Sequence, residues 1–288
     1  MIDRAILLAG GSGNRLKPLT KIINKHLVNI FDKPMIYYSL SILLLMKIKK
    51  ILIIVNKKDL NLFKKILGNG SQLGIEIKYK IQSKADGISS GIFLGKNFVK
   101  NKNFVSILGD NFFYGYNLSE ILINFSQKFK SGAQIFIKNY QNTSQLGVVE
   151  IKKGKIKKIL EKPKNSKSKK IITGIYFLDK NFFSYFKNIK ISPRNEFEIK
   201  DILECYKKNK QLNYVDLGIG TTWSDLGDLN SIHNITRFID QIYNIQHLSI
   251  GFLEEIAYKN KWISRKKLLP LTKSNTFYSR YVKEFLSR

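Results

Sequence analysis

The chain contains 288 residues, of which 43% are hydrophobic, and it carries a formal net charge of +29 at pH 7. This length and apolar content predict a soluble globular protein with a substantial core. The single cysteine, Cys205, excludes an intramolecular disulfide and favours a reducing compartment, so we expect a cytoplasmic protein. The N-terminus lacks the layout of a secretory signal, and Lys47, Lys49 and Lys50 interrupt the apolar stretch 35–55, so no membrane span is expected.

The positive charge comes mostly from lysine. Lysines are spread along the whole chain beside abundant Ile and Asn, whereas arginine is rare. These three abundant residue types have AT-rich codons, so a compositional bias of the genome accounts for them without a selected partner. Nucleic-acid readers favour arginine for bidentate contacts to bases and phosphates, and no binding motif of that kind is visible. We therefore predict no nucleic-acid partner.

The first predicted element is a buried strand over residues 5–9, followed by a glycine-rich loop. Gly10, Gly11 and Gly13 allow a charged group to approach the backbone, whose N–H groups can cradle phosphate oxygens. Arg15 adds a planar cation that can hold a phosphate in two places. The P-loop spacing is absent, and Leu16 stands where a dinucleotide-binding loop has its third glycine. The glycines alone leave open whether the turn binds phosphate or only connects two elements.

Helix-type and strand-type patterns then alternate through the first 110 residues. We expect helices over residues 34–46, 60–67 and 88–98 and strands over residues 50–56, 75–82 and 104–108. This alternation predicts a doubly wound, mostly parallel, Rossmann-like sheet with helices on both faces. Ligands of such sheets bind beyond the carboxyl ends of the strands. Residues 10–15, 82–87 and 110–111 are therefore expected to form one site.

The second half of the chain changes to strand-type patterns. We expect strands over 133–139, 147–153, 155–160, 171–177 and 212–217, a hairpin turn at Lys153–Gly154, an exposed loop at 162–170, a helix at 195–208 and helices from 229 to the end. The predicted organisation is an α/β domain over residues 1–228, with a small β region at about 133–177. A C-terminal helical appendage over residues 229–288 completes it.

Three charged positions are candidates for chemistry. Asp110 follows a buried strand and Asp225 lies in a loop after Trp223, and two carboxylates from distant segments suit Mg²⁺. Asp110 could instead cap a helix. Glu161 and Lys162 could hold a sugar hydroxyl and its phosphate, or form a surface ion pair.

The sequence GGSGNRLKPLT at 10–20, with Lys25 downstream, resembles the signature of the sugar-1-phosphate nucleotidyltransferases. Further segments resemble one branch of that family, the glucose-1-phosphate thymidylyltransferases, in order and at close spacing. They are GSQLG at 70–74, LGDNFFYG at 108–115, LGVVE at 146–150, EKP at 161–163, TGIYF at 173–177, EFEIKD at 196–201 and LEEIA at 253–257.

The resemblance implies residue roles. In such enzymes the arginine matching Arg15 and the lysines matching Lys25 and Lys162 neutralise phosphate charge. The implied Mg²⁺ ligands are Asp110 and Asp225. The implied nucleotide-binding residues are Leu8, Ala9, Gly10, Gly11, Ser12, Gly13, Asn14, Arg15, Lys25, His26, Gln82, Gly87 and Asp110, with Gln82 and Gly87 at the base. The implied sugar-phosphate residues are Asn111, Gly147, Glu161, Lys162, Ile172 and Tyr176.

The resemblance also implies the reaction and the assembly. A phosphate oxygen of glucose 1-phosphate attacks the α-phosphorus of dTTP, pyrophosphate leaves, and the product enters dTDP-rhamnose synthesis. The enzymes of this branch tend to be homotetramers. The alternatives are a relative that uses UTP or another sugar 1-phosphate, and a catalytically weakened remnant that only binds. Retention of the charged site residues argues against the remnant.

Several positions depart from the branch pattern. His26, Ser90, Leu146 and Leu226 replace a glutamine, a glutamine, a tyrosine and a threonine. The branch also has a second, regulatory nucleotide site, where Ile219 replaces an arginine. We therefore expect weakened feedback inhibition. The residues that match this possible site are Tyr38, Leu45, Tyr114, Gly115, Ile219, Glu255 and Ile256.

Overall fold

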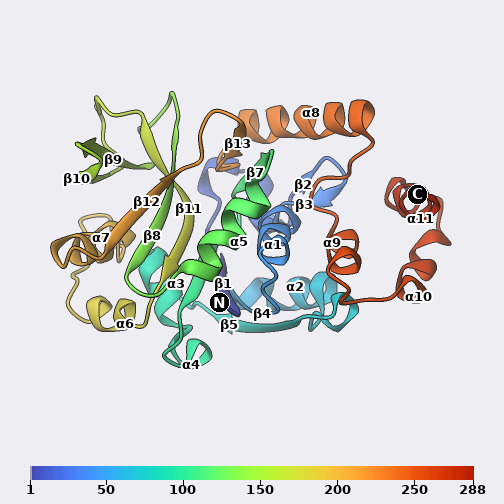
Figure 1. The fold of residues 1–288 in the computed structure, drawn as a ribbon, viewed down its shortest axis with the longest axis horizontal. Helices are drawn as coiled ribbons and strands as arrows, with labels where there is room; N and C mark the ends of the chain where they lie inside the picture. The colour runs from blue at the N-terminus through green and yellow to red at the C-terminus, as the bar shows by residue number, and fades with distance from the viewer. Residues whose placement is uncertain (1) are drawn as a thin grey trace.

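The computed structural model describes residues 2–288, which are built around a nine-stranded mixed sheet (Figure 1). Four neighbouring strands are parallel and are ordered β5-β4-β1-β6, with β5 at the edge of the sheet. β1, β4 and β6 are runs of mostly apolar residues, as expected for strands covered on both faces, whereas β5 alternates between apolar and charged residues. These strands are β1 (Arg4–Ala9), β4 (Lys50–Val55), β5 (Glu76–Ile81) and β6 (Phe104–Leu108).

Beyond β6 the sheet continues through β11 (Lys170–Leu178), which runs antiparallel to β6 and also pairs with two further strands, β8 and β9. β11 pairs with β6 near its end and with β9 near its start. Its pairing with β8 shifts register between Ile172 and Tyr176, around Gly174, which has a φ of 79°. The remaining strands are β8 (Ala133–Asn139), β9 (Gly147–Lys152), β10 (Lys155–Glu161) and β12 (Leu212–Asp216), and Lys153–Gly154 forms the predicted turn between β9 and β10.

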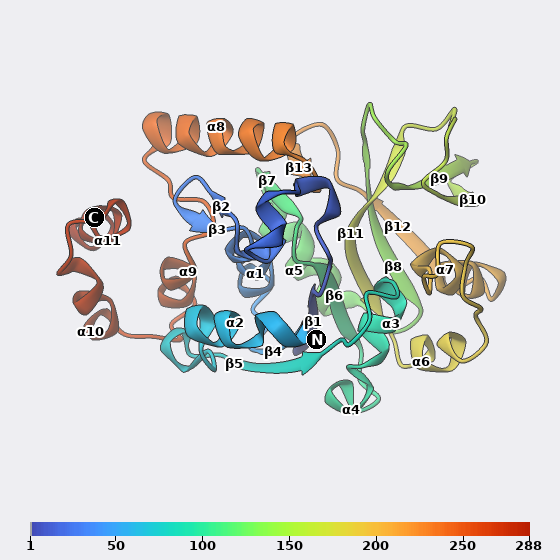
Figure 2. The same cartoon turned by 180° about the vertical axis from the view of Figure 1, so that it is seen from behind.

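Helices cover both faces of the sheet (Figures 1 and 2). Alternate residues of β1 show this: Leu7 belongs to the apolar cluster that contains α1, and Ile6 belongs to the cluster of α3 and α7. The predicted fold class is thereby confirmed. The helices before residue 229 are α1 (Ile36–Leu45), α2 (Leu60–Leu67), α3 (Ile88–Phe93), α4 (Lys96–Val99), α5 (Leu118–Lys128), α6 (Asn181–Phe186) and α7 (Ile199–Lys208).

Two small antiparallel pairs accompany the main sheet. β7 (Phe112–Gly115) pairs with β13 (Thr221–Ser224), and this pair brings Asp225 towards the end of β6. β2 (Asn29–Ile30) pairs with β3 (Lys33–Pro34) just before α1. The sequence patterns did not predict β7, β13, β2 or β3.

The chain after residue 228 is helical, as predicted. α8 begins with a capping box at Asp228 and runs along one edge of the molecule, and α10 and α11 lie at the end opposite the β9–β10 hairpin (Figures 1 and 2). Phe252, Leu253 and Tyr281 belong to the same apolar cluster as the residues of α1. The domain boundary at residue 228 stays a prediction. The elements are α8 (Leu229–Gln246), α9 (Leu253–Lys259), α10 (Arg265–Leu268), a 3₁₀ turn (Leu269–Thr272) and α11 (Phe277–Ser287).

Three predicted helix boundaries were wrong. Pro34 pairs with Asn29 in β3, so α1 starts two residues later, at Ile36. The helix predicted over 88–98 breaks at Gly95, where a methyl group would lie 2.4 Å from Ile6 Cδ1. Asn195 has a φ of 57° and belongs to a turn, so α7 starts at Ile199. Within residues 2–288, no helix is both long enough and apolar enough to cross a membrane.

Candidate active site

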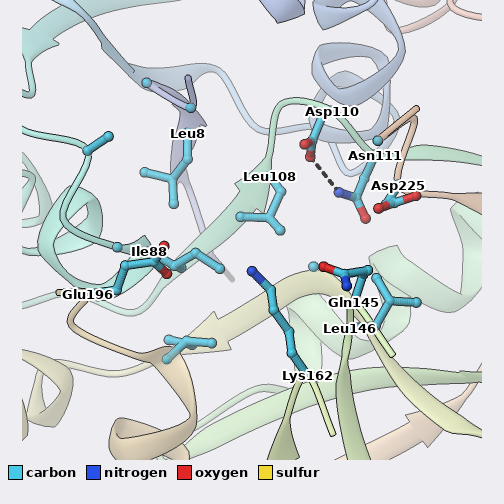
Figure 3. Close-up of a pocket in the computed structure, with 18 of the residues that line it drawn as sticks. Leu8, Ile88, Leu108, Asp110, Asn111, Gln145, Leu146, Lys162, Glu196 and Asp225 are labelled. Carbon is cyan, nitrogen blue, oxygen red and sulfur yellow. Dashed lines mark hydrogen bonds between the residues drawn. The ribbon is translucent and has the colours of Figure 1, made fainter. Parts of the chain in front are cut away.

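A cavity of about 400 Å³ opens at the carboxyl ends of β1 and β6 and is closed on its far side by β9, β10 and β11 (Figure 3). Its lining includes Arg15 and Lys25 from the first loops and Asp110 after β6. The β region contributes Glu161 and Lys162 from the opposite wall. The three loops that the strand order predicted to converge, at residues 10–15, 82–87 and 110–111, each contribute residues to this cavity.

The glycine loop is tightly packed. Gly13 has a φ of 62°, and a methyl group on it would lie 2.8 Å from Thr20 Cγ2. A methyl group on Gly10 would lie 2.8 Å from Oε1 of Gln82. Position 13 therefore requires glycine, and the close approach of Gly10 places the loop directly against the predicted base-binding glutamine. Leu8, Gly11, Ser12, Gly13 and Asn14 line the cavity, whereas buried Ala9 is absent from its lining.

Arg15 and Asp225 meet across the cavity mouth. Nη2 of Arg15 lies 3.2 Å from Oδ2 of Asp225, and a methyl group on Gly227 would collide with that guanidinium at 2.3 Å. The Arg15 side chain is about half exposed, with a relative exposure of 47%. Such solvated pairs are weak, typically ~0–1 kcal/mol, so the guanidinium is free to turn towards a phosphate.

The carboxylate of Asp110 is held more firmly than that of Asp225. Its Oδ2 lies 2.6 Å from Nζ of Lys25, and its Oδ1 accepts a 2.9 Å hydrogen bond from Nδ2 of Asn111. Asn111 is itself fixed by Trp223, whose indole N–H donates to Oδ1 at 2.8 Å. Burial opposes ionisation of Asp110, but Lys25 and the other polar neighbours outweigh it, so the pKa of this carboxyl lies below its usual value. Asp110 is therefore an anion at neutral pH.

The two carboxylates fit a magnesium site that a substrate completes. Asp110 and Asp225 line the same cavity, and Figure 3 shows their carboxylates on the same side of it. Within residues 2–288, no group of three or more His, Cys, Asp or Glu side chains is arranged to hold a metal by itself. Mg²⁺ commonly takes one or two carboxylates and fills its other positions with water and phosphate oxygens. The oxygen donors present therefore suit Mg²⁺ bound together with a nucleotide.

Gln82 is oriented by its neighbours. Its Nε2 donates to Oδ1 of Asp86 at 3.0 Å and to the carbonyl of Gly87 at 3.3 Å. Both partners are acceptors, so the side-chain carbonyl is left to face Gly10 and Gly91. The predicted base site is thus shaped before a nucleotide enters.

The opposite wall carries a glutamate and a lysine. Lys162 follows β10 with a φ of 44°, and its side chain reaches into the middle of the cavity (Figure 3). Burial, together with the nearby Glu198, raises the pKa of Glu161. Asn111, Gly147, Ile172 and Tyr176, which the resemblance assigns to the sugar-phosphate site, also line the cavity.

The comparisons with known proteins agree with this geometry. A family model described as nucleotidyl transferase matches residues 4–242. The chain belongs to the nucleotidyl transferase family.

The chain is also similar over its full length to members of one branch of that family. Glucose-1-phosphate thymidylyltransferase of Neisseria meningitidis is 39% identical over 288 residues, covering 99% of this chain and 100% of the relative. The enzyme of the same name from Mycolicibacterium smegmatis is 36% identical, with 99% of each chain covered. This chain is therefore placed in the glucose-1-phosphate thymidylyltransferase branch of the nucleotidyl transferases.

Solved structures show the same fold. A Bacillus anthracis crystal structure, described as a glucose-1-phosphate thymidylyltransferase in complex with sucrose, has a TM-score of 0.75 and 37% identity. It covers 82% of this chain and 94% of that chain. A UDP-glucose pyrophosphorylase complexed with UDP-glucose has a TM-score of 0.73 at 22% identity, covering 84% and 99% of the two chains, and this likeness concerns the fold alone.

Arg194 is a cavity residue of this nucleotidyl transferase that the sequence reasoning missed. Its guanidinium donates to both carboxylate oxygens of Glu198 at 2.8 Å and also contacts Glu196 and Glu161. An arginine in a chain whose cations are nearly all lysine was the available signal, because arginine alone makes bidentate contacts. Other missed lining residues include Gln145, Glu196, Glu198, Lys200, Trp223 and Gly227.

The residues that match the branch's regulatory site lie on neighbouring elements outside the cavity. Tyr38 and Leu45 belong to helix α1, which contacts both β7 and α9. Strand β7 contains Tyr114 and Gly115, and α9 contains Glu255 and Ile256. Tyr38 is buried, and its hydroxyl donates to the carbonyl of Ile30 at 2.6 Å. Ile219 is 99% exposed, in the turn before β13, which pairs with β7.

Two of the departures from the branch pattern have clear positions. Leu226 is fully buried in the apolar cluster of Tyr38 and Phe112 rather than in the cavity. Leu146 lines the cavity beside Gly147. The first change therefore affects packing, and the second affects the surface that a substrate meets.

Proposed function

We propose that this protein transfers a thymidylyl group from dTTP to glucose 1-phosphate, giving dTDP-glucose and pyrophosphate. The observation that carries the proposal is the single cavity that holds cations on two opposite walls. Arg15 and Lys25 stand on the glycine-loop side, and Lys162 and Arg194 on the β-region side. Two phosphorylated substrates can thus be held face to face, with the carboxylates of Asp110 and Asp225 between them.

The glycine-loop wall would take dTTP. Residues 10–15 line the cavity, where their backbone N–H groups would meet the phosphates, and Arg15 can leave Asp225 for a phosphate at little energetic cost. Gln82 and Gly87 would receive the base, since the glutamine's amide is already oriented by Asp86. Lys25 would neutralise charge that builds on the phosphates during transfer.

The opposite wall would take glucose 1-phosphate. Glu161 is a partly buried acceptor suited to a sugar hydroxyl, and Lys162 reaches the cavity centre, where the sugar's phosphate has to lie. The attacking oxygen of that phosphate is already an anion at pH 7, so no general base is required. The bond from this oxygen to the α-phosphorus of dTTP forms as the bond to the pyrophosphate oxygen breaks. The protein contributes by holding the two groups in line and by neutralising charge.

Mg²⁺ bound by Asp110 and Asp225 would supply further charge neutralisation to the phosphates. Lys25 keeps Asp110 ionised and ready for a metal, and Asn111 with Trp223 fixes its rotamer. We further propose that the protein acts in the cytoplasm as a homotetramer, on the route to dTDP-rhamnose.

Pyrophosphate release tests the proposal directly. The purified protein is incubated with Mg²⁺, glucose 1-phosphate and each nucleoside triphosphate in turn. We expect release with dTTP that depends on glucose 1-phosphate, and dTDP-glucose as the second product. The absence of release with every triphosphate would leave only a binding function, and release with another sugar 1-phosphate alone would replace the proposed substrate.

UTP is the second candidate donor. Thymine and uracil differ by one methyl group, which a pocket distinguishes by only ~1–3 kcal/mol. Leu8 and Ile88 line the cavity near Gln82 and Gly87 and offer an apolar surface to that methyl group. We expect dTTP to be preferred over UTP by about tenfold or more on this basis.

A further inference from the structure

Asn24 connects a buried carboxylate to the histidine that replaces the branch's glutamine. Its Nδ2 donates to Oδ2 of Asp59 at 2.6 Å and lies 3.5 Å from the carbonyl oxygen of Ala9. Its Oδ1 accepts two hydrogen bonds of 2.9 Å from His26, one from the backbone N–H and one from Nδ1 of the ring. Asp59, Asn24 and His26 are all buried, so none of these partners can be exchanged freely for water.

This chain of contacts fixes which ring nitrogen carries the proton. A carboxylate and a backbone carbonyl can only accept, so the NH₂ group of Asn24 has to face Asp59 and Ala9. The oxygen of Asn24 then faces His26 and can only accept, so Nδ1 has to be the protonated nitrogen. In the neutral ring this leaves Nε2 as an acceptor. Burial, with the charge of Asp110 opposing it, lowers the pKa of His26 to about 4, which agrees with a neutral ring.

The acceptor nitrogen lies at the cavity wall. The two ring carbons that flank Nε2 are Cε1 and Cδ2. A methyl group on Gly11 would lie 3.7 Å from Cε1, and a methyl group on Gly109 would lie 2.8 Å from Cδ2. The ring therefore sits between the glycine loop and the end of β6, and it lines the cavity. No group within residues 2–288 makes a hydrogen bond to Nε2. Nε2 is therefore open to a donor in the cavity, which is water in the free protein and can be a ligand in the complex.

The chemistry of a thymidine nucleotide identifies that donor. Its only hydrogen-bond donors at neutral pH are the N3–H of the base and the 3′-hydroxyl. The base end of the cavity is marked by Gln82 beside Gly10, and the phosphate end by Gly13 and Arg15. Gly11, which faces His26, lies between them, where the pentose joins the base to the phosphates.

We propose that Asp59 and Asn24 are positioning residues that hold His26 in its Nδ1–H tautomer, so that Nε2 accepts a hydrogen bond from the 3′-hydroxyl of the bound nucleotide. The identity of the ligand rests on the proposed function, whereas the tautomer follows from the contacts of the protein alone. A glutamine at position 26 could turn its amide to donate or to accept, but the fixed imidazole only accepts.

The first experiment measures the tautomer without any ligand. Long-range ¹H–¹⁵N NMR spectra of the three histidine rings, assigned with His26→Phe, distinguish Nδ1–H from Nε2–H. We expect the Nδ1–H pattern for His26 in the unmodified protein and in the matched control Asn56→Ala, which removes a 3.4 Å contact to Asp59 but none to Asn24. Asn24→Ala should give a mixture of tautomers. An Nε2–H ring in the unmodified protein would overturn the inference.

The second experiment compares two nucleotides by calorimetry, dTTP and 3′-deoxythymidine triphosphate, with Mg²⁺ present. One neutral hydrogen bond corresponds to about a two- to tenfold change in affinity. We expect dTTP to bind about fivefold more tightly to the unmodified protein and to Asn56→Ala, and the two nucleotides to bind within about twofold of each other in His26→Phe. Equal binding to the unmodified protein would overturn the inference alone, whereas failure of dTTP to bind at all would overturn the proposed function.

Discussion

The ammonium group of Lys25 lies 2.6 Å from the carboxylate of Asp110, a residue 85 positions away in the sequence. The lysine side chain is almost completely buried, with a relative exposure of 6%. A buried cation and anion that pair with one another each require the other, because an unpaired charge in such a place is costly. This pair also joins the loop that would hold a nucleotide to the strand end that would hold a metal.

The carboxylates should therefore be essential for turnover. We expect Asp110→Asn and Asp225→Asn to lower kcat by at least about a hundredfold, because each loses an oxygen donor to Mg²⁺ and a partner of Lys25 or Arg15. Chelation of Mg²⁺ should abolish the activity of the unmodified protein. The measurement is pyrophosphate release, with circular dichroism to check folding. Asp240→Asn, on the exposed side of α8, is the control, and full activity of the folded Asp110→Asn protein would contradict the metal assignment.

Replacing a cation on one wall of the cavity should chiefly change the KM of one substrate, and replacing a cation on the other wall should chiefly change the KM of the other. Arg15→Ala should chiefly raise KM for dTTP, and Lys162→Ala should chiefly raise KM for glucose 1-phosphate, because each faces a different substrate. Both should lower kcat as well, since charge moves during the transfer. Lys164→Ala, in the exposed loop after Lys162, should resemble the unmodified protein. Identical profiles for Arg15→Ala and Lys162→Ala would show that the two walls are wrongly assigned.

Arg194 should matter through its planar, bidentate geometry. It binds both oxygens of Glu198 and also contacts Glu161, whose pKa is raised by burial. Arg194→Lys keeps the charge but cannot hold two oxygens in one plane, so we expect KM for glucose 1-phosphate to rise about tenfold. KM for dTTP should change by less than twofold. Equal changes in the two KM values would argue for a general loss of structure instead.

His26 should make the protein sensitive to acid. Its pKa is lowered from 6.5 to about 4 in the folded state, chiefly by burial, so the unfolded chain takes up the proton first as the pH falls. The contribution of neutral His26 to the free energy of unfolding is fully present above pH 6.5. It is lost progressively between about pH 6.5 and pH 4, with a size of order 1–3 kcal/mol.

Denaturant unfolding at a series of pH values measures this loss. His26→Gln should lose less stability across the same interval, because glutamine does not titrate. His233→Gln, a change of an exposed side chain on α8, should keep the slope of the unmodified protein. Parallel stability curves for His26→Gln and the unmodified protein would contradict the prediction.

Ile219 should weaken feedback inhibition. A fully exposed isoleucine cannot pair with the phosphates of a regulatory nucleotide, and one charge-assisted hydrogen bond contributes ~1.5–3 kcal/mol. We expect inhibition by dTDP-rhamnose to be at least about tenfold stronger in Ile219→Arg. Lys138 is the neighbour that could compensate, since its ammonium group donates to the carbonyl of Gly218 at 3.0 Å.

The double variant Lys138→Ala/Ile219→Arg separates these contributions. If the arginine is responsible, the double variant should be inhibited as strongly as Ile219→Arg. Inhibition of the unmodified protein at low micromolar product that disappears in Lys138→Ala would instead assign the role to the lysine.

Local patterns in the sequence were enough for the central strands, for α2 and for the glycine loop. Strand and helix periods are read within a few residues, and the conformational freedom of Gly13 is a property of that residue alone. The edge of the sheet at which the loops meet also followed from the sequence, because the alternation of strands and helices fixes their direction. Pro34 and Gly95 were misplaced in the predicted helices for a different reason. Their conformations are set by contacts with Asn29 and Ile6, which a local pattern does not contain.

The sequence by itself determined the family signature, the α/β class and most of the charged residues of the cavity. Only the tertiary structure decided which charges pair: Lys25 with Asp110, Arg15 with Asp225, and Arg194 with Glu198. It also decided which nitrogen of His26 is protonated, through Asn24 and Asp59. The physical reason is that an ion pair or a tautomer depends on distances of about 3 Å between side chains from separate segments, and the packing of the whole sheet sets those distances.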